Sequence, residues 1–378
     1  MSAFARDSAG THDPTLPVPS IVTGGGLDTP AAHLGEGEVR QLAIARYGLD
    51  GAFTRFATEK DDTFRILTAD GPGFVLKVAN PAEKEGEIDF QLGLLEHVER
   101  AAPGLPLPRV QRDLSGRRYS FYAARDGTER IVRVVSYLDG IPLDRTETSA
   151  PQRALLGAAL ARLRLATASF RHEWESRELA WDVQHLLKLE PLLAQVDDAE
   201  QRVLLARALE RFARISGALA TARRQVLHND VNKSNVVVDP AAAQFITGII
   251  DFGDAVRTAT AVDVSTTLCS FLPERPAGDP FGQPRDIVRG YLSVADLSDA
   301  ELALIPHLVM GRCTVRALLT LWRAKFFPQN ADYILRNTAQ GWWQLRWFLA
   351  RSADEIGECL LTVRETSERS AANRKDLR

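Results

Sequence analysis

The stretch VLHNDVNKSNVVVDPAAAQFITGIIDFGDA, residues 226–255, decides the fold of this chain. It contains two short runs rich in Val and Ile, at 235–239 and 245–250, and a turn with Pro and three Ala separates them. Two such runs around a short turn predict a β-hairpin. The tripeptide HND precedes the first run, and DFG follows the second run directly. Polar side chains are therefore expected at the ends of the hairpin strands.

These polar residues suit the transfer of a phosphoryl group. Mg²⁺ prefers oxygen ligands and takes one or two carboxylates beside waters and phosphates, so Asn235 and Asp251 are the predicted metal ligands. Asp230 is the predicted base that accepts the proton of the attacking hydroxyl. His228 is predicted to brace the loop. Each residue alone is ordinary turn chemistry, but both halves in this order favour a catalytic site.

The order H-x-D-x-x-x-x-N followed by D-F-G resembles the catalytic and metal-binding signature of the protein-kinase-like fold. Protein kinases normally have Arg where this chain has Asn229, and they close an activation loop with A-P-E, which does not follow here. The stretch is more similar to the aminoglycoside phosphotransferase-like kinases that act on small molecules. Within that family it most resembles hydroxylysine kinase and the kinase domains fused to class III aminotransferases.

The resemblance covers roughly residues 40–350. It implies an α+β, protein-kinase-like fold with an N-terminal antiparallel sheet lobe and a larger helical C-terminal lobe. The chain is predicted to contain a disordered leader (1–35), a nucleotide-binding N-lobe (36–138), a helical C-lobe with the catalytic hairpin (139–363) and a flexible tail (364–378). The leader is rich in Pro, Gly, Ser and Thr and the tail is charged, which favours disorder in both.

Length and composition fit an ordinary globular protein. The chain has 378 residues, of which 45% are hydrophobic and 25% charged, enough for two lobes. Its net charge of −3 predicts neither a nucleic-acid nor an anionic membrane partner. Three scattered cysteines without a CxxC indicate no disulfide framework or zinc site, so a reducing cytoplasm is expected. No signal peptide and no run near the roughly 20 apolar residues of a membrane span are recognised.

The N-lobe is predicted to hold a phosphate-binding lysine. Lys77 interrupts the apolar run 74–78, and only seven of the 46 basic residues are lysines. It resembles the kinase lysine of the third strand, which binds the donor phosphates, although a lysine on the solvent face of an edge strand is the alternative. The resemblance also implies an acidic partner on the following helix. Asp89 is the first candidate, with Glu85 and Glu87 as rivals.

Two further segments are predicted to contact the nucleotide. The turn between the first two strands has no G-x-G-x-x-G, and it resembles the acidic, glycine-poor turn of the hydroxylysine kinase group. That resemblance implies that Asp62 and Thr63 lie over the nucleotide. Residues 136–138 lie where a kinase hinge would be, so backbone groups of Ser136 and Leu138 are expected at the purine. A simple linker between lobes is equally compatible with this segment.

The C-lobe is predicted to supply the acceptor site. From residue 151 the composition becomes helical, and a comparable helical insert in the aminotransferase-linked kinases helps to form that site. The insert is acidic between 173 and 190, which would suit a cationic amine, although a run of charges is usually a solvated helix face. Asp182 and Asp254 are the candidate residues that contact the acceptor.

The predicted reaction is transfer of the γ-phosphate of ATP or GTP, with Mg²⁺, to a hydroxyl of a small amine-bearing metabolite. Hydroxylysine-like amino alcohols are the first candidate acceptors, aminoglycosides the second, and choline, ethanolamine and homoserine follow. A monomer or homodimer is expected. One alternative is a nucleotide-binding pseudokinase or scaffold, which the presence of all the catalytic residues disfavours. A protein kinase is the other, and the lack of A-P-E and of a glycine-rich loop disfavours it.

Overall fold

The computed structural model describes residues 17–24, 27, 29, 33–56, 58, 61–69, 71–124, 127–276, 278–336 and 338–363. The chain divides into two compact units. The sheet unit consists of Thr29–Arg177 and Val226–Arg257, and the helical unit consists of Met1–Asp28, Glu178–Gln225 and Thr258–Arg378. This division differs from the predicted boundary between residues 138 and 139, because the hairpin and the residues up to 177 pack with the N-terminal sheet.

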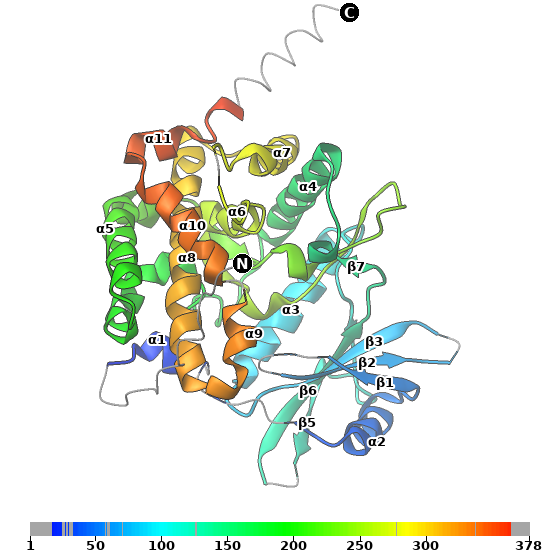
Figure 1. Ribbon diagram of the computed structural model, residues 1–378. Coiled ribbons are helices and arrows are strands. Elements are labelled where there is room, and N and C mark those ends of the chain that lie inside the picture. The colour runs from blue at the N-terminus through cyan, green and yellow to red at the C-terminus, as the bar shows by residue number, and fades with distance from the viewer. Residues whose placement is uncertain are drawn as a thin grey trace, which may run out of the picture. The chain divides into compact units, whose positions relative to one another are not determined.

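A six-stranded antiparallel sheet forms the centre of the sheet unit (Figure 1). Its strands are β1 (Ala52–Arg55), β2 (Asp62–Leu67), β3 (Gly73–Val78), β4 (Val110–Gln111), β5 (Tyr119–Ala123) and β6 (Glu129–Ser136). The order is β1-β2-β3-β6-β4, and β5 also pairs with β6. The predicted antiparallel N-terminal sheet is thereby confirmed.

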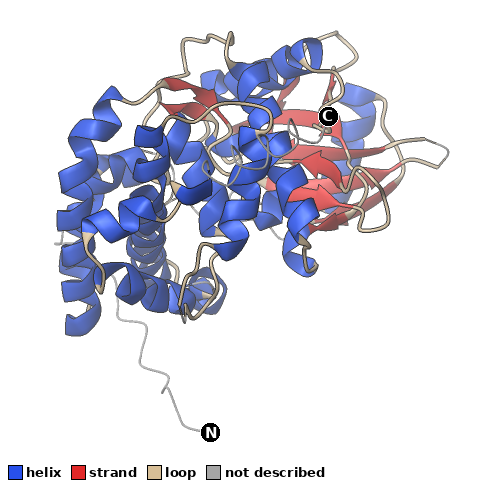
Figure 2. Cartoon of the chain, turned by 90° about the horizontal axis from the view of Figure 1, so that it is seen from above, coloured by secondary structure: helices blue, strands red, loops and turns tan. Residues whose placement is uncertain are grey.

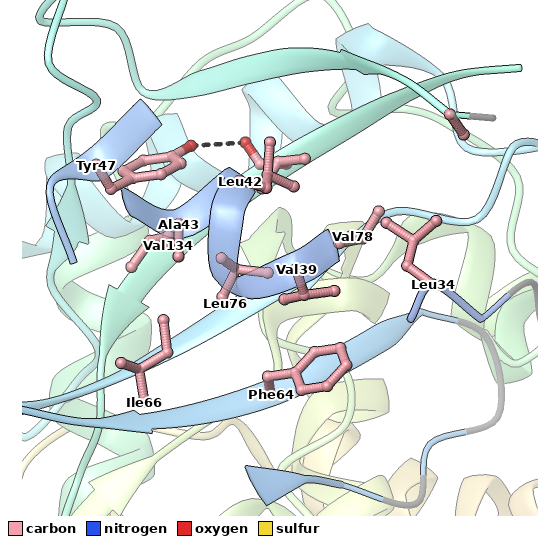
Figure 3. Close-up of a cluster of buried hydrophobic side chains, with 12 residues drawn as sticks. Leu34, Val39, Leu42, Ala43, Tyr47, Phe64, Ile66, Leu76, Val78 and Val134 are labelled. Carbon is pink, nitrogen blue, oxygen red and sulfur yellow. Dashed lines mark hydrogen bonds between the residues drawn. The ribbon is translucent and has the colours of Figure 1, made fainter. Parts of the chain in front are cut away.

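Helix α2 (Glu36–Tyr47) covers one face of this sheet (Figure 3). It ends at Gly48, whose φ of 67° is the left-handed conformation that favours glycine at a helix C-terminus. Buried side chains of α2 pack with Leu76 and Val78 of β3 and with neighbours on β2 and β6. Because side chains alternate along a strand, Lys77 faces the opposite side of the sheet.

The predicted hairpin is present in the sheet unit. It consists of β9 (Val236–Val238) and β10 (Ile246–Ile249), which pair antiparallel. Strand β7 (Ile141–Pro142), followed by η1 (Leu143–Arg145), pairs with β9 and so connects the segment after β6 with the hairpin. Besides α2, the α-helices described in this unit are α3 (Glu85–Ala101) and α4 (Ala150–Thr167), and η3 (Lys233–Asn235) and η4 (Phe252–Asp254) lie at the two ends of the hairpin. Strands β8 (Arg224–Leu227) and β11 (Val256–Ala259) lie where the chain passes between units.

Apart from the ends of β8 and β11, the regular elements described in the helical unit are helices (Figure 2). They are α1 (Ser20–Thr23), η2 (Val183–Gln195), α5 (Ala199–Thr221), α6 (Thr260–Cys269), α7 (Gly282–Leu292), α8 (Asp299–Phe326), η5 (Pro328–Asn330), α9 (Ala331–Leu335), α10 (Thr338–Leu349) and α11 (Ala353–Glu358). Element η2 is a 3₁₀-helix that contains Pro191, in agreement with proline's missing N–H group.

Two observations in the helical unit differ from expectation. Helix α8 is long and apolar enough to cross a membrane, contrary to the prediction that no such run exists, but 83% of its most apolar stretch is buried within the protein. Within the predicted disordered leader, α1 is ordered and buries Ile21 and Val22. Residues 1–16 of that leader and the predicted tail 364–378 lie outside the described residues.

Candidate active site

Lys77 and Asp251 meet in the sheet unit. Lys77 Nζ lies 3.3 Å from Asp251 Oδ1. Asp251 has a left-handed backbone with φ 64°, and its side chain is 52% exposed. The positive charge of Lys77 lowers the pKa of the Asp251 carboxyl below its ordinary value. Asp251 is therefore an ionised carboxylate with solvent access, which is what binding of a cation requires.

The loop before the hairpin orders the predicted base. Asn235 Nδ2 donates to the backbone carbonyl of Asp230 at 2.9 Å and to Asp230 Oδ2 at 2.8 Å. Asn232 Nδ2 donates to the same Oδ2 at 3.1 Å. The carboxylate of Asp230 is thus held in one orientation. Because Asn235 uses its amide nitrogen here, its Oδ1 is the atom left for a metal ion.

His228 ties this loop to the segment that carries Asp251. Its Nε2–H donates to the carbonyl of Ile250 at 3.0 Å, and its Nδ1 accepts the backbone N–H of Asp230 at 3.2 Å. The ring also packs on Phe252, with centroids 4.5 Å apart. Burial lowers the pKa of His228 to about 4, so the imidazole is neutral. These contacts agree with a bracing role.

The predicted pair of Lys77 with Asp89 is absent from the described part of the chain. Asp89 binds Arg118 Nη1 at 2.8 Å and His172 Nε2 at 3.2 Å. The two rival acids on α3 also have other partners, because Glu85 accepts from Tyr119 at 2.6 Å and Glu87 pairs with Arg177 at 3.5 Å. The prediction that Asp89 pairs with Lys77 is therefore wrong, since side chains other than Lys77 bind all three acids of this helix.

The predicted role of Asp62 is also wrong. Strand β2 begins at Asp62, so its side chain lies on the sheet face opposite that of Thr63. It is 1% exposed and accepts from the backbone N–H of Leu34 at 2.8 Å and from Arg55. Thr63 lies opposite Lys77 across β2 and β3, on the predicted nucleotide face. Its buried hydroxyl has no hydrogen-bond partner among the described residues.

Two residues on this face were missed. Arg133 of β6 lies directly opposite Lys77 of β3, which places both cations on one face of the sheet. Asp61 accepts from Arg133 Nη2 at 2.7 Å, whereas Arg133 Nη1 is buried without a hydrogen-bond partner in the described residues. The sequence could have indicated Arg133 in the same way as Lys77, because Arg133 is a basic residue inside the apolar run RIVRVVS, residues 130–136.

The two residues predicted to contact the purine, Ser136 at the end of β6 and Leu138 after it, differ in whether their backbone is already hydrogen-bonded. The N–H of Ser136 donates to Arg109 at 2.8 Å, and that of Tyr137 donates to Gly73 at 2.8 Å. The N–H of Ser136 is thus used within the sheet, which contradicts its predicted availability for a purine. Leu138 follows the strand end, and its backbone makes no hydrogen bond to any described residue. A purine contact of the Leu138 backbone therefore stays a prediction.

The two candidate acceptor residues also differ. Asp182 is fully buried and caps η2, accepting from the N–H of Gln184 at 3.1 Å and from Thr258 Oγ1 at 3.2 Å. Burial raises its pKa to about 6. An acid closed off in this way cannot meet a metabolite, so its predicted role is corrected to a structural one. Asp254 is half-buried at the end of η4, three residues after Asp251.

The oxygen donors of the site suit Mg²⁺ bound together with phosphates. No group of three or more His, Cys, Asp and Glu residues suited to a metal occurs within the described ranges. The site instead offers one carboxylate, from Asp251, and one carboxamide, from Asn235. Magnesium keeps several waters and binds through one or two carboxylates plus substrate phosphates. These two residues therefore fit such an ion.

Comparison with known proteins agrees with this geometry. Residues 53–296 match the model of the phosphotransferase enzyme family. Hydroxylysine kinase of Mus musculus is 22% identical, over 76% of this chain and 81% of that protein. Homoserine kinase of Acidiphilium cryptum (strain JF-5) is 29% identical, over 79% of this chain and 89% of that protein.

Among solved structures, amicoumacin kinase in complex with AMP-PNP, Ca²⁺ and Ami has a similar fold. The TM-score is 0.64 at 20% identity, and the alignment covers 86% of this chain and 94% of that one. Likeness at this identity establishes the fold. The predictions of a kinase-like fold and of a phosphotransferase are thereby confirmed, and the chain belongs to the phosphotransferase enzyme family.

Proposed function

We propose that this phosphotransferase moves the γ-phosphate of ATP or GTP to a hydroxyl of a small amine-bearing metabolite, with hydroxylysine-like amino alcohols as first candidates. Relatives named hydroxylysine kinase and homoserine kinase support an acceptor of this kind. A structural neighbour solved with AMP-PNP supports a nucleotide donor. The observation that carries the proposal is the contact of Lys77 with Asp251, beside a loop in which Asn235 orients Asp230.

Asp230 is the proposed base. It takes the proton of the acceptor hydroxyl as that oxygen attacks the γ-phosphorus, and the bond from phosphorus to the β–γ bridging oxygen breaks. The nucleoside diphosphate leaves with the electron pair. The amide hydrogen bonds from Asn235 and Asn232 hold the Asp230 carboxylate in place, so little reorganisation is needed when the hydroxyl arrives.

Asn235 and Asp251 are the proposed Mg²⁺ ligands, and the ion would neutralise and orient the β- and γ-phosphates. Lys77 is proposed to bind phosphate oxygens from the sheet side. Arg133 adds a second positive charge on the same face, and its pairing with Asp61 sets the direction of the guanidinium. Thr63 and the backbone of Leu138 complete the proposed nucleotide contacts.

A coupled assay of nucleotide consumption tests the proposal. ATP and GTP are offered with Mg²⁺ against hydroxylysine, other amino alcohols, homoserine and aminoglycosides. Asp230→Asn is expected to lower kcat by about 100-fold or more. Asp239→Asn is the matched control, because Asp239 lies at the exposed turn of the same hairpin and its side chain accepts a local N–H, that of Ala241, at 2.9 Å.

The outcomes separate the candidate functions. Turnover of an amino alcohol that Asp230→Asn removes supports the proposal, whereas turnover of aminoglycosides alone assigns a resistance activity. A thermal shift with nucleotide but no turnover across the panel favours a pseudokinase. Failure to bind nucleotide at all contradicts the proposal. We further propose that the enzyme works in a reducing cytoplasm, as a monomer or homodimer, without nucleic-acid or membrane partners.

A further inference from the structure

The segment 170–177, here called the bracket, lies along the first turns of α3. His172 Nε2 donates to Asp89 at 3.2 Å, while its Nδ1 accepts the N–H of Trp174 at 3.1 Å. The Trp174 ring lies against Gly86 so closely that a Cβ there would stand 2.1 Å from the ring. Only glycine permits this approach. The bracket is thus held to α3 by both a polar and a packing contact.

The other end of the bracket holds the chain that follows Asp251. Arg177 Nη2 donates to the carbonyls of Gly253 and of Ala255, the latter at 3.0 Å. The N–H of Arg257 donates to the carbonyl of Glu175 at 2.6 Å, and the two side chains pair at 3.3 Å. The bracket therefore joins α3 to the loop that begins with the proposed metal ligand.

Arg177 carries most of this connection. Its side chain is 8% exposed and pairs with Glu87 at 3.5 Å, while the guanidinium lies 5.6 Å from the Phe90 ring centroid. A guanidinium buried to this degree requires its partners, because removing Glu87 would leave the charge of Arg177 buried without a counter-charge. One guanidinium thus ties a carboxylate of α3 to the carbonyls of Gly253 in η4 and of Ala255 directly after it. A lysine could not make these contacts together.

The loop that Arg177 holds is under backbone strain. Asp251 has φ 64°, a conformation that residues other than glycine adopt only when their surroundings enforce it. We propose that Arg177 is a positioning residue for the metal site: it holds η4 so that Asp251 keeps this conformation and directs its carboxylate at Mg²⁺. Glu87 of α3 then acts through Arg177 rather than through Lys77. This inference rests on the proposed function of Asp251.

The test measures metal binding directly. Mn²⁺ binding in the presence of a non-hydrolysable ATP analogue is followed by electron paramagnetic resonance in the full chain. Arg177→Ala is expected to weaken Mn²⁺ binding by about tenfold or more, the usual effect of losing a residue that orients a metal ligand. Arg171→Ala is the matched control, because Arg171 is in the bracket and its side chain bonds locally, to the carbonyls of Ala168 and Phe170. It is expected to bind Mn²⁺ as the wild type does.

Two further variants keep the inference testable if Arg177→Ala does not fold. Glu87→Gln removes one partner of Arg177, and Gly86→Ala displaces Trp174. Each is expected to weaken Mn²⁺ binding while leaving binding of the metal-free nucleotide unchanged. Unaltered Mn²⁺ binding in Arg177→Ala, or in both other variants, overturns the role of Arg177 but leaves the proposed function standing. A wild type that binds no Mn²⁺ with nucleotide overturns the proposed function as well.

Discussion

Lys77 in β3 forms its ion pair with Asp251, which lies 174 residues further along the chain. The kinase-like interpretation of the sequence instead placed an acid of α3 beside this lysine. The observed pair brings together the proposed phosphate-binding cation and the proposed metal-binding carboxylate. The charge of Lys77 and that of Asp251 therefore compensate each other, and the lowered pKa keeps the Asp251 carboxyl ionised.

Replacing Lys77 by Met tests its role in donor binding. The variant removes the cation that faces the proposed phosphate site, so kcat/KM for the nucleotide is expected to fall by about 100-fold or more. Steady-state kinetics at saturating acceptor measure this change. Lys188→Met is the control, since Lys188 is exposed and pairs with Glu178. An equal loss in both variants would show that the effect is not specific to the site.

Replacing Asp89 by Asn distinguishes the observed pairing from the predicted one. Asp89 contacts Arg118 and His172, and its side chain is 34% exposed. An ion pair of that exposure contributes at most about 1 kcal/mol, so kcat/KM for the nucleotide is expected to change by less than about fivefold. A loss as large as that of Lys77→Met would instead mean that Asp89 holds Lys77 during turnover.

The parts of the site that are contiguous in the chain could be predicted from the sequence. The hairpin, its two polar motifs and the position of Lys77 between Leu76 and Val78 all depend on spacing within one segment. Local period and spacing determine which face a strand residue occupies. The hairpin follows from this local pattern, whereas the fold class was implied by the resemblance of the two motifs to a known family.

The parts that depend on which segments meet could not be predicted. Asp62 was expected in the turn over the nucleotide, but it is the first residue of β2, so its side chain and that of Thr63 point to opposite faces of the sheet. Likewise, Cys269 and Cys313 are 44 residues apart in sequence, yet their sulfurs lie 3.6 Å apart in the helical unit. The partners of an acid on a helix, such as Asp89, are likewise set by residues distant in sequence.

The segment proposed to bind the purine depends on close packing with the hairpin. A Cβ added to Gly248 of β10 would lie 2.8 Å from Leu138 Cδ1 and 3.2 Å from Val237 Cβ. Gly248→Ala is therefore expected to destabilise the fold by about 1–3 kcal/mol and to raise KM for the nucleotide by displacing Leu138. Urea unfolding and kinetics measure the two effects.

Gly217→Ala is the matched control for Gly248→Ala. Gly217 lies inside α5, and nothing stands within 4 Å of an added Cβ. Alanine is the better helix former, so this variant is expected to be stabilised by up to about 1 kcal/mol. If Gly248→Ala leaves both stability and KM unchanged, the packing of Leu138 on β10 does not position the nucleotide segment.

The last prediction concerns acid stability and His228. This residue is 1% exposed, and burial lowers its pKa to about 4, from an ordinary value of about 6.5. The unfolded chain therefore binds a proton at a higher pH than the folded protein does. The contribution of His228 to stability is fully present above about pH 6.5 and is lost as the pH falls toward 4.

His228→Gln isolates this effect, because glutamine keeps an N–H donor for the Ile250 carbonyl and does not titrate. Between pH 7 and pH 4.5, the wild type is expected to lose about 2 kcal/mol more unfolding free energy than the variant. Urea unfolding across this range measures the difference. His97→Gln controls for the loss of an imidazole, since His97 bonds to Ser169 at the surface. Parallel stability curves for the wild type and His228→Gln would show that folding does not shift the pKa of His228. The imidazole would then not be the buried, uncharged group that connects Asp230 with Ile250 in the structure.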